Sequence, residues 1–166
     1  MTAARNASDR AGHPAASTRA RPLLRSLAEA SLVVLLAAAY SFYSLLRHAS
    51  FGSAGYDLGI FDQAVRSYSL GHPPWAPVKG IEYNLLGDHF HPIIALIQPL
   101  YLIWPDPRLL LIVQALVVAL ALVPILRILD RRLPRVCSGI VAVIIMLSWP
   151  MQGLIDFDFH EVWRSR

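Results

Sequence analysis

The chain has 166 residues, of which 55% are hydrophobic and only 16% are charged, and its formal net charge is +4. A soluble domain normally carries about 25% charged residues, and here the shortfall lies in long apolar blocks, so the composition indicates a membrane protein. The basic residues stand in short clusters beside these blocks without interleaved aromatic residues, which argues against nucleic-acid binding. The single cysteine, Cys137, excludes an internal disulfide and a multi-cysteine metal site.

The N-terminal region combines a basic tail with an apolar run. Residues 1–26 are rich in Ala, Arg and Ser and show no apolar periodicity, so we expect a disordered tail that stays in the cytoplasm. Residues 27–46 are an apolar run of 20 residues, which as a helix matches a hydrocarbon core of about 30 Å. Ala37 to Ala39 resemble the cleavage site of a secretory signal peptide, which is the alternative interpretation. The apolar run continues past them and further runs follow, which favours a first transmembrane helix.

Residues 47–91 differ in composition, with many Gly, Pro, His, aromatic and acidic residues, and we expect residues 47–108 to form a large extracytoplasmic loop. Within this loop, residues 57–70 have helical spacing, and their apolar face consists of Leu58, Phe61, Val65 and Tyr68. Asp57 is placed to cap this helix. Asp62 precedes Arg66 by four positions, which is the spacing of a surface ion pair on a helix.

Three further apolar runs follow. Residues 92–104 are apolar but too short to span a bilayer comfortably, and Pro99 interrupts them. Residues 109–129 and residues 136–155 are both long enough to span, and we expect them to be the second and third transmembrane helices.

The basic residues of the loop 130–135 decide the expected topology. If residues 92–104 crossed the membrane, the three arginines of this loop (Arg131, Arg132 and Arg135) would face outward. If residues 92–104 instead form an interfacial or re-entrant helix, the arginines return to the cytoplasm, where short basic loops tend to remain. We therefore expect an all-α integral membrane protein with about three spans, a cytoplasmic N-terminus and an extracytoplasmic end at residues 156–166.

This topology places three polar clusters in one extracytoplasmic compartment. They are Asp57 with Asp62; Asp88, His89 and His91 of "GDHFHP"; and Asp156, Asp158, His160 and Glu161 of "DFDFHE". Carboxylates can act as a general base or hold a divalent metal, and histidines can bind phosphate or metal. Such clusters beside a bilayer fit a site for an anionic lipid headgroup. Each cluster also has a structural explanation, as a helix cap, an ion pair or a solvated loop.

The motifs and their order resemble two groups of proteins. "DLGIFDQ", "GDHFHPI" and "DFDFHE" are similar to motifs of a bacterial family of predicted membrane proteins of unknown function. Residues 27–160 also resemble the N-terminal part of GT-C superfamily glycosyltransferases, the group that contains protein mannosyltransferases and aminoarabinose transferases. The shared order is a first span, an acid that opens an outside loop helix (Asp57), a Gly–Trp–Pro segment ("LGHPPWAP"), a Pro-containing juxtamembrane helix, and a second span closed by Arg131 and Arg132.

The resemblance implies a multi-pass transferase of the bacterial plasma membrane that takes its sugar from a polyprenyl phosphate. In that superfamily the first-loop acid is implicated as general base or metal ligand, a role that falls on Asp57, with Asp62 as a second acid. The histidine of "FHP", His91, stands where related transferases often have Lys-Pro-Pro, and would take over the phosphate contact. A divalent metal would then have Asp57, His89 and His91 as candidate ligands.

Related transferases are much longer than this chain, so we expect it to be an N-terminal fragment or a truncated product. Two other functions remain open, a transporter or channel module and a non-catalytic membrane assembly protein. The spans contain almost no ionisable residues, and Gln114 and Pro124 are the notable interruptions of the second span. Transport pathways commonly contain buried ionisable groups, which favours the transferase over the transporter.

Overall fold

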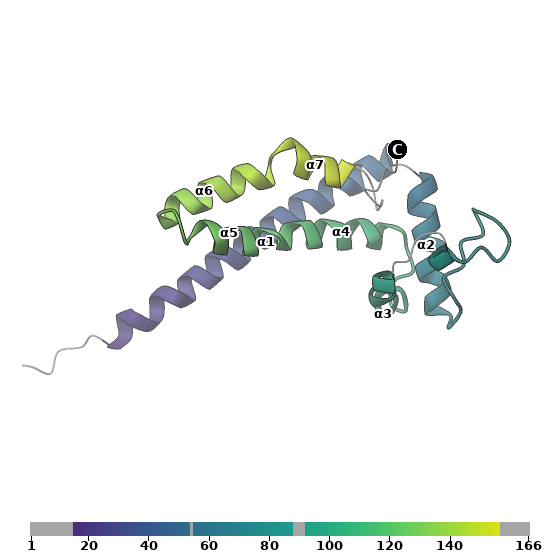
Figure 1. The fold of residues 1–166 in the computed structure, drawn as a ribbon, viewed down its shortest axis with the longest axis horizontal. Helices are drawn as coiled ribbons and strands as arrows, with labels where there is room; N and C mark the ends of the chain where they lie inside the picture. Colours follow the sequence, from purple (N-terminus) through teal and green to yellow (C-terminus); the bar gives the residue numbers. More distant parts are fainter. Residues whose placement is uncertain (1–14, 54, 88–91, 157–166) are drawn as a thin grey trace, which may run out of the picture. The chain divides into compact units, whose positions relative to one another are not determined.

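The computed structural model describes residues 15–53, 55–87 and 92–156, which form helices joined by loops. The longer helices are α1 (Ala15–Ala49), α2 (Gly55–Ser69), α4 (Arg108–Leu120) and α6 (Arg135–Met146). The shorter elements are η1 (Leu85–Gly87), η2 (Pro92–Ile97), α3 (Gln98–Tyr101), α5 (Leu122–Leu129) and α7 (Trp149–Asp156), and Figure 1 follows them along the chain. The expected all-helical class is confirmed for these three ranges.

The chain divides into two compact units, residues 1–32 and residues 33–166. The described part of the first unit is the beginning of α1, which starts at Ala15. The second half of the segment expected to be a disordered tail is therefore helical. Alanine and arginine are both strong helix formers, and Arg25 is paired with Glu29 one turn later, with 2.5 Å between Nε and Oε1.

Two helical stretches are long and apolar enough to cross a membrane. They are Leu24–Ala49, with a mean hydropathy of 1.6, and Arg108–Leu129, with a mean hydropathy of 2.9. The pair α6 and α7 adds a third candidate if the two helices are one bent span. These candidates overlap the runs expected from the sequence at residues 27–46, 109–129 and 136–155. The protein thus has two or three candidate membrane-spanning helices.

The later two candidate spans are interrupted beside prolines. α4 and α5 meet at Ala121, three residues before Pro124. Proline has no N–H to donate to the carbonyl four residues earlier, so a helix is weakened at that point. α6 and α7 are bent by 44°, and Pro150 likewise withholds a donor from the carbonyl of Met146. That carbonyl instead accepts the hydroxyl of Tyr40 in α1. The bend therefore provides a polar contact between the first and third candidate spans.

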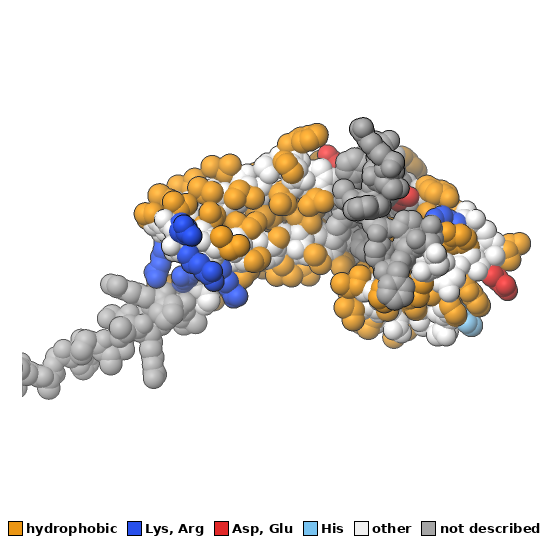
Figure 2. Space-filling model, viewed as in Figure 1, with side chains coloured by type: hydrophobic (Ala, Val, Ile, Leu, Met, Phe, Trp, Pro, Cys, Tyr) orange, Lys and Arg blue, Asp and Glu red, His pale blue; other side chains and the backbone are white. Residues whose placement is uncertain are grey.

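Small side chains occupy buried positions in the helices after the connecting loop. Ala115 and Ala119 in α4, and Ser138 and Ala142 in α6, are fully buried and stand four residues apart in each helix. In a membrane, small residues at this spacing allow helix backbones to approach closely. Figure 2 shows hydrophobic side chains over the surface of this part of the molecule, and Lys and Arg at the end where α5 meets α6. The exposed arginines at that end are Arg127, Arg131, Arg132 and Arg135.

Enlarging one of these small residues should weaken the helix packing. We expect Ala142→Leu to lower the stability of the protein by about 1–3 kcal/mol, because the added side chain has no space at a fully buried position. The melting temperature of the purified protein in detergent micelles measures this. Ala38→Leu is the size-matched control, because Ala38 lies on an exposed face of α1. Equal melting temperatures for the two variants would contradict the assignment of Ala142 to a helix contact.

The connecting segment between α1 and α4, residues 50–107, has an apolar core of its own. α2, η1, η2, α3 and the start of α4 contribute to this core. Its members other than alanine are Leu58, Ile60, Phe61, Val65, Leu85, Ile94, Ile97, Tyr101, Leu110 and Leu111. The loop after α2 closes on itself, since the Ala76 amide donates to the Tyr83 carbonyl at 2.9 Å and the Leu85 amide donates to the Pro74 carbonyl at 3.0 Å. The connecting segment is therefore a packed body fixed to the first turn of α4.

Candidate functional site

The first acid of the connecting segment, Asp57, lies at the start of α2. The sequence predicted a helix at residues 57–70 with Asp57 as its cap, but α2 begins at Gly55, so Asp57 lies within its first turn. The N–H groups of a first turn carry partial positive charge that stabilises a carboxylate, which explains why an acid is accommodated there. The Asp57 side chain is half-buried. Local helix geometry therefore holds this carboxylate at a defined position after α1.

Asp62 lies on a different face of the same helix. Five positions correspond to about 140° of rotation around an α-helix, so Asp57 and Asp62 do not form a carboxylate pair on one side of α2. The ion pair expected from the spacing is present, since Arg66 Nη2 lies 3.3 Å from each carboxylate oxygen of Asp62. Tyr101 of α3 donates its hydroxyl to Asp62 Oδ1 at 2.9 Å.

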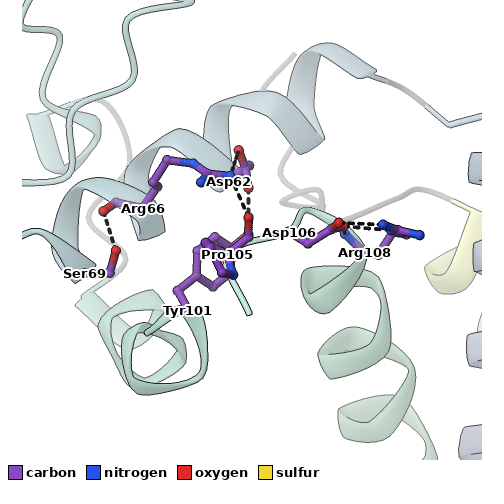
Figure 3. A network of polar contacts seen from close by, with 7 residues as sticks. All are labelled: Asp62, Arg66, Ser69, Tyr101, Pro105, Asp106 and Arg108. Carbon is purple, nitrogen blue, oxygen red and sulfur yellow. Dashed lines mark hydrogen bonds and ion pairs between the residues drawn. The ribbon is translucent and has the colours of Figure 1, made fainter. Parts of the chain in front are cut away.

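These contacts belong to a network that joins α2 to the segment before α4 (Figure 3). Besides binding Asp62, Arg66 donates to the carbonyl of Pro105 at 3.0 Å. The Asp62 side chain is only 16% exposed, whereas that of Arg66 is 42% exposed. The carboxylate of Asp62 thus accepts hydrogen bonds from the side chains of Arg66 and Tyr101. The bond from Tyr101 holds α2 against α3.

A second carboxylate, Asp106, fixes the start of α4. Arg108 binds it in a fork, with Nε 2.9 Å from Oδ1 and Nη2 2.7 Å from Oδ2, and the Arg108 amide also donates to Oδ1 at 2.9 Å. The hydrogen bonds from the Arg108 side chain lower the pKa of Asp106, and the nearby His48 at the end of α1 acts in the same direction. The guanidinium of Arg108 also lies over the ring of Trp104, 5.8 Å from its centroid.

Among the described titratable groups of the connecting segment, the phenol of Tyr101 has the most strongly shifted pKa. Burial, followed by the negative charge of Asp62 and the hydrogen bond to it, raises the pKa of Tyr101 well above its ordinary value. A group with a raised folded-state pKa contributes stability below its unfolded-state pKa and loses that contribution as the pH rises. The network around Asp62 is therefore sensitive to alkaline pH.

Tyr101→Phe should make this alkaline dependence measurable. The wild-type protein should lose stability relative to the variant by about 1.4 kcal/mol for each pH unit above 10, because its unfolded state releases a proton that its folded state retains. Melting temperatures of both proteins in detergent micelles at pH 8, 10 and 11 give the difference. A difference that does not change with pH would contradict the buried, hydrogen-bonded phenol.

A third polar cluster joins the ends of α1 and α7. Tyr43 donates its hydroxyl to Asp156 Oδ1 at 2.7 Å, and Arg47 donates through Nη1 to the Asp156 carbonyl at 2.5 Å. Gln114 of α4 donates to the carbonyl of Leu154. Side chains of α1 and α4 thus bind carbonyls at the end of α7, where the last carbonyls of a helix have no N–H partner within the helix. The C-terminal ends of α1 and α7 and the N-terminal half of α4 therefore meet on one side.

A cavity of about 220 Å³ lies beside this cluster. It is lined by Tyr40 and Tyr43 of α1 and by Gln152 and Ile155 of α7. The sequence analysis did not identify Tyr43, Arg47 or Gln152 as site residues. Tyrosine and arginine in the last turns of a span are common interfacial residues, so their type alone did not distinguish them.

Residues 47–163 match the family model described as "Predicted membrane protein (DUF2079)". The chain belongs to the DUF2079 family. The match covers well over half of the sequence and includes "DLGIFDQ", "GDHFHPI" and "DFDFHE". No curated protein and no solved structure matches the chain. Its membership of DUF2079 identifies the chain as a predicted membrane protein, in agreement with its apolar helices.

The structure describes only some of the site residues predicted for this DUF2079 chain. Asp57 and Asp62 lie on α2, as set out above. The remaining predicted residues lie outside the described part of the chain: Asp88, His89, His91, Asp158, His160 and Glu161. Among the described residues, no three His, Cys, Asp or Glu side chains come together as a metal-binding group. Asp156 is the last residue of α7 and directly precedes "FDFHE". Its hydrogen bond from Tyr43 places it beside the C-terminal end of α1.

Proposed function

We propose that this DUF2079 chain belongs to a cell-envelope glycosyltransferase that uses a sugar linked to a lipid phosphate. The observation that carries the proposal is the position of Asp57, in the first turn of a helix that follows the first candidate span and is held by the Asp62–Tyr101–Arg66 network. The order of features that resembles GT-C transferases adds further support. A lipid-linked donor has its tail in the bilayer and its headgroup at the interface. A carboxylate that follows a span closely, as Asp57 does, lies at the depth where it could reach that headgroup.

In the proposed reaction the acceptor hydroxyl attacks the anomeric carbon of the donor sugar, and Asp57 accepts the proton of that hydroxyl. The bond between the anomeric carbon and the phosphate oxygen breaks, and the phosphate leaves with the electron pair. We assign Asp62 a positioning role, because its oxygens bind Tyr101 and Arg66 and thereby orient α2.

The two polar motifs outside the described residues are proposed to bind the donor phosphate. Asp88, His89 and His91 belong to the connecting segment, and Asp158, His160 and Glu161 follow the end of α7. Support comes from the contacts of Tyr43 and Arg47 with Asp156, because they bring the start of the second motif to the end of α1. A divalent cation held by such carboxylates and imidazoles would stabilise negative charge on the phosphate.

We further propose that the N-terminus and the arginines at the junction of α5 and α6 lie in the cytoplasm of a bacterial plasma membrane, with the connecting segment outside. The exposed arginines Arg127, Arg131, Arg132 and Arg135 support this orientation, because basic residues in short loops favour the cytoplasmic side. The protein would then bind the donor headgroup on the extracytoplasmic side.

Deletion of the gene that encodes the chain tests the proposed function. We expect a sugar to be lost from one class of cell-envelope glycan or glycolipid, detected by mass spectrometry of extracted lipids and released glycans, and restored by the wild-type gene. Unchanged glycans in the deletion strain would contradict the transferase and favour a transporter or an assembly protein.

A further inference from the structure

The turn between α5 and α6 carries a concentrated positive charge. Between Arg127 and Arg135 the chain contains four arginines, and the one acid among them is Asp130. All four arginines are exposed, and Figure 2 shows basic side chains gathered where α5 meets α6. We call these residues the arginine cluster: Arg127, Arg131, Arg132 and Arg135.

The arginine cluster differs from the other arginines of the described residues. Those arginines are paired with carboxylates, as Arg25 is with Glu29 and Arg108 is with Asp106; the others so paired are Arg47 and Arg66. Within residues 15–53, 55–87 and 92–156, no carboxylate lies in ion-pair contact with the arginine cluster. Its four guanidinium groups are therefore available to an anion from outside this part of the chain.

The backbone of the turn is held by its own hydrogen bonds. The amides of Arg132 and Leu133 both donate to the carbonyl of Leu129 at 2.9 Å, and Pro134 precedes the first residue of α6. Groups that are already fixed lose little conformational entropy when they bind a ligand. The arginine cluster is thus carried on a turn that is ordered before binding.

Apolar side chains alternate with the arginine cluster. Ile128, Leu133 and Val136 are 63%, 37% and 75% exposed. The candidate span Arg108–Leu129 ends within the cluster, and the bent pair of α6 and α7 begins at its last arginine. Arginine at the end of a span can keep its stem against hydrocarbon and its charged group at the surface. A ligand that fits this surface combines negative charge with hydrocarbon.

We propose that the arginine cluster binds the phosphodiester of an anionic phospholipid, whose acyl chains lie along Ile128, Leu133 and Val136. The guanidinium fork matches the oxygens of a phosphate, and basic clusters beside a transmembrane helix attract anionic lipids. A nucleic acid or an acidic protein would satisfy the charges but would leave these three apolar side chains in water. The site goes beyond the transferase and does not depend on it.

Lipid titration of the full chain in detergent micelles, followed by native mass spectrometry, tests the proposal. The probes are dioleoyl phosphatidylglycerol, which is anionic, and dioleoyl phosphatidylcholine, which is zwitterionic. We expect Arg131→Gln/Arg132→Gln to lower the affinity for phosphatidylglycerol about 10–30-fold, because each basic residue at a lipid surface changes that affinity by about fivefold. The affinity for phosphatidylcholine should stay the same.

Two variants are the controls. Arg5→Gln/Arg10→Gln removes the same number of charges from the N-terminal region, and Arg131→Lys/Arg132→Lys keeps both charges in the turn. Both should bind phosphatidylglycerol within about threefold of the wild type. An unchanged affinity of the glutamine variant of the turn would overturn the proposal. An equal loss in the N-terminal variant would mean that net charge alone attracts the lipid, and an equal loss in the lysine variant would mean that the arginines act through packing.

Discussion

Asp57→Asn is expected to lower the rate of sugar transfer by about 10²–10⁴-fold, the range attributed to a general base. The amide has nearly the same size and shape as the carboxylate but cannot accept the proton of the attacking hydroxyl. Because Asp57 lies in the first turn of α2 and is half-buried, the substitution should leave the helix in place. The measurement is the incorporation of labelled sugar from a polyprenyl-phosphate donor into membranes isolated from the deletion strain that expresses each variant.

Glu82→Gln is the control for this experiment. Glu82 is an exposed acid of the same connecting segment, and it lies in a loop after α2. The control should retain the wild-type rate at equal amounts of protein in the membrane. If Asp57→Asn also retains the wild-type rate, Asp57 is not the base, even where deletion of the gene removes the glycan.

Asp62→Ala is expected to destabilise the connecting segment. It removes the acceptor for the hydroxyl of Tyr101, a residue that is only 1% exposed, and it leaves Arg66 without this carboxylate. An unsatisfied buried hydroxyl and the loss of a charged hydrogen bond together cost about 2–3 kcal/mol. For a protein of this size, that corresponds to a decrease in melting temperature of roughly 4–12 °C, which calorimetry in detergent micelles measures.

The double variant Asp62→Ala/Tyr101→Phe separates the two causes. Removing both partners leaves no buried hydroxyl without an acceptor, so the double variant should be more stable than Asp62→Ala alone. If the double variant is equally or less stable, the hydrogen bond between Tyr101 and Asp62 contributes little. The assignment of Asp62 to positioning would then lose its basis.

Features that depend on neighbours along the chain were predictable from the sequence. The apolar runs at residues 27–46, 109–129 and 136–155 reappear as candidate spans, because length and hydropathy are local properties. The ion pair between Asp62 and Arg66 follows from their four-residue spacing. The beginning of α2 was placed two residues late, since residues Gly55 and Tyr56 carry no clear start signal.

Contacts between distant residues could not be read from the sequence. Tyr101 binds Asp62 across 39 positions, and Tyr43 binds Asp156 across 113 positions. Such pairs depend on how the helices are arranged, which no local pattern contains. The bend between α6 and α7 was also missed, although Pro150 gave a signal for it, because the run 136–155 is predominantly apolar and contains no charged residue.

The contact between Tyr40 and the carbonyl of Met146 has a consequence for biogenesis. These two groups are 106 positions apart, and the carbonyl of Asp156 that Arg47 binds is separated from it by 109 positions. While the ribosome is still producing the intervening chain, Tyr40 and Arg47 cannot make these two contacts. As a candidate span, α1 must therefore be inserted before these contacts form, and its association with α7 is a separate, later step of assembly.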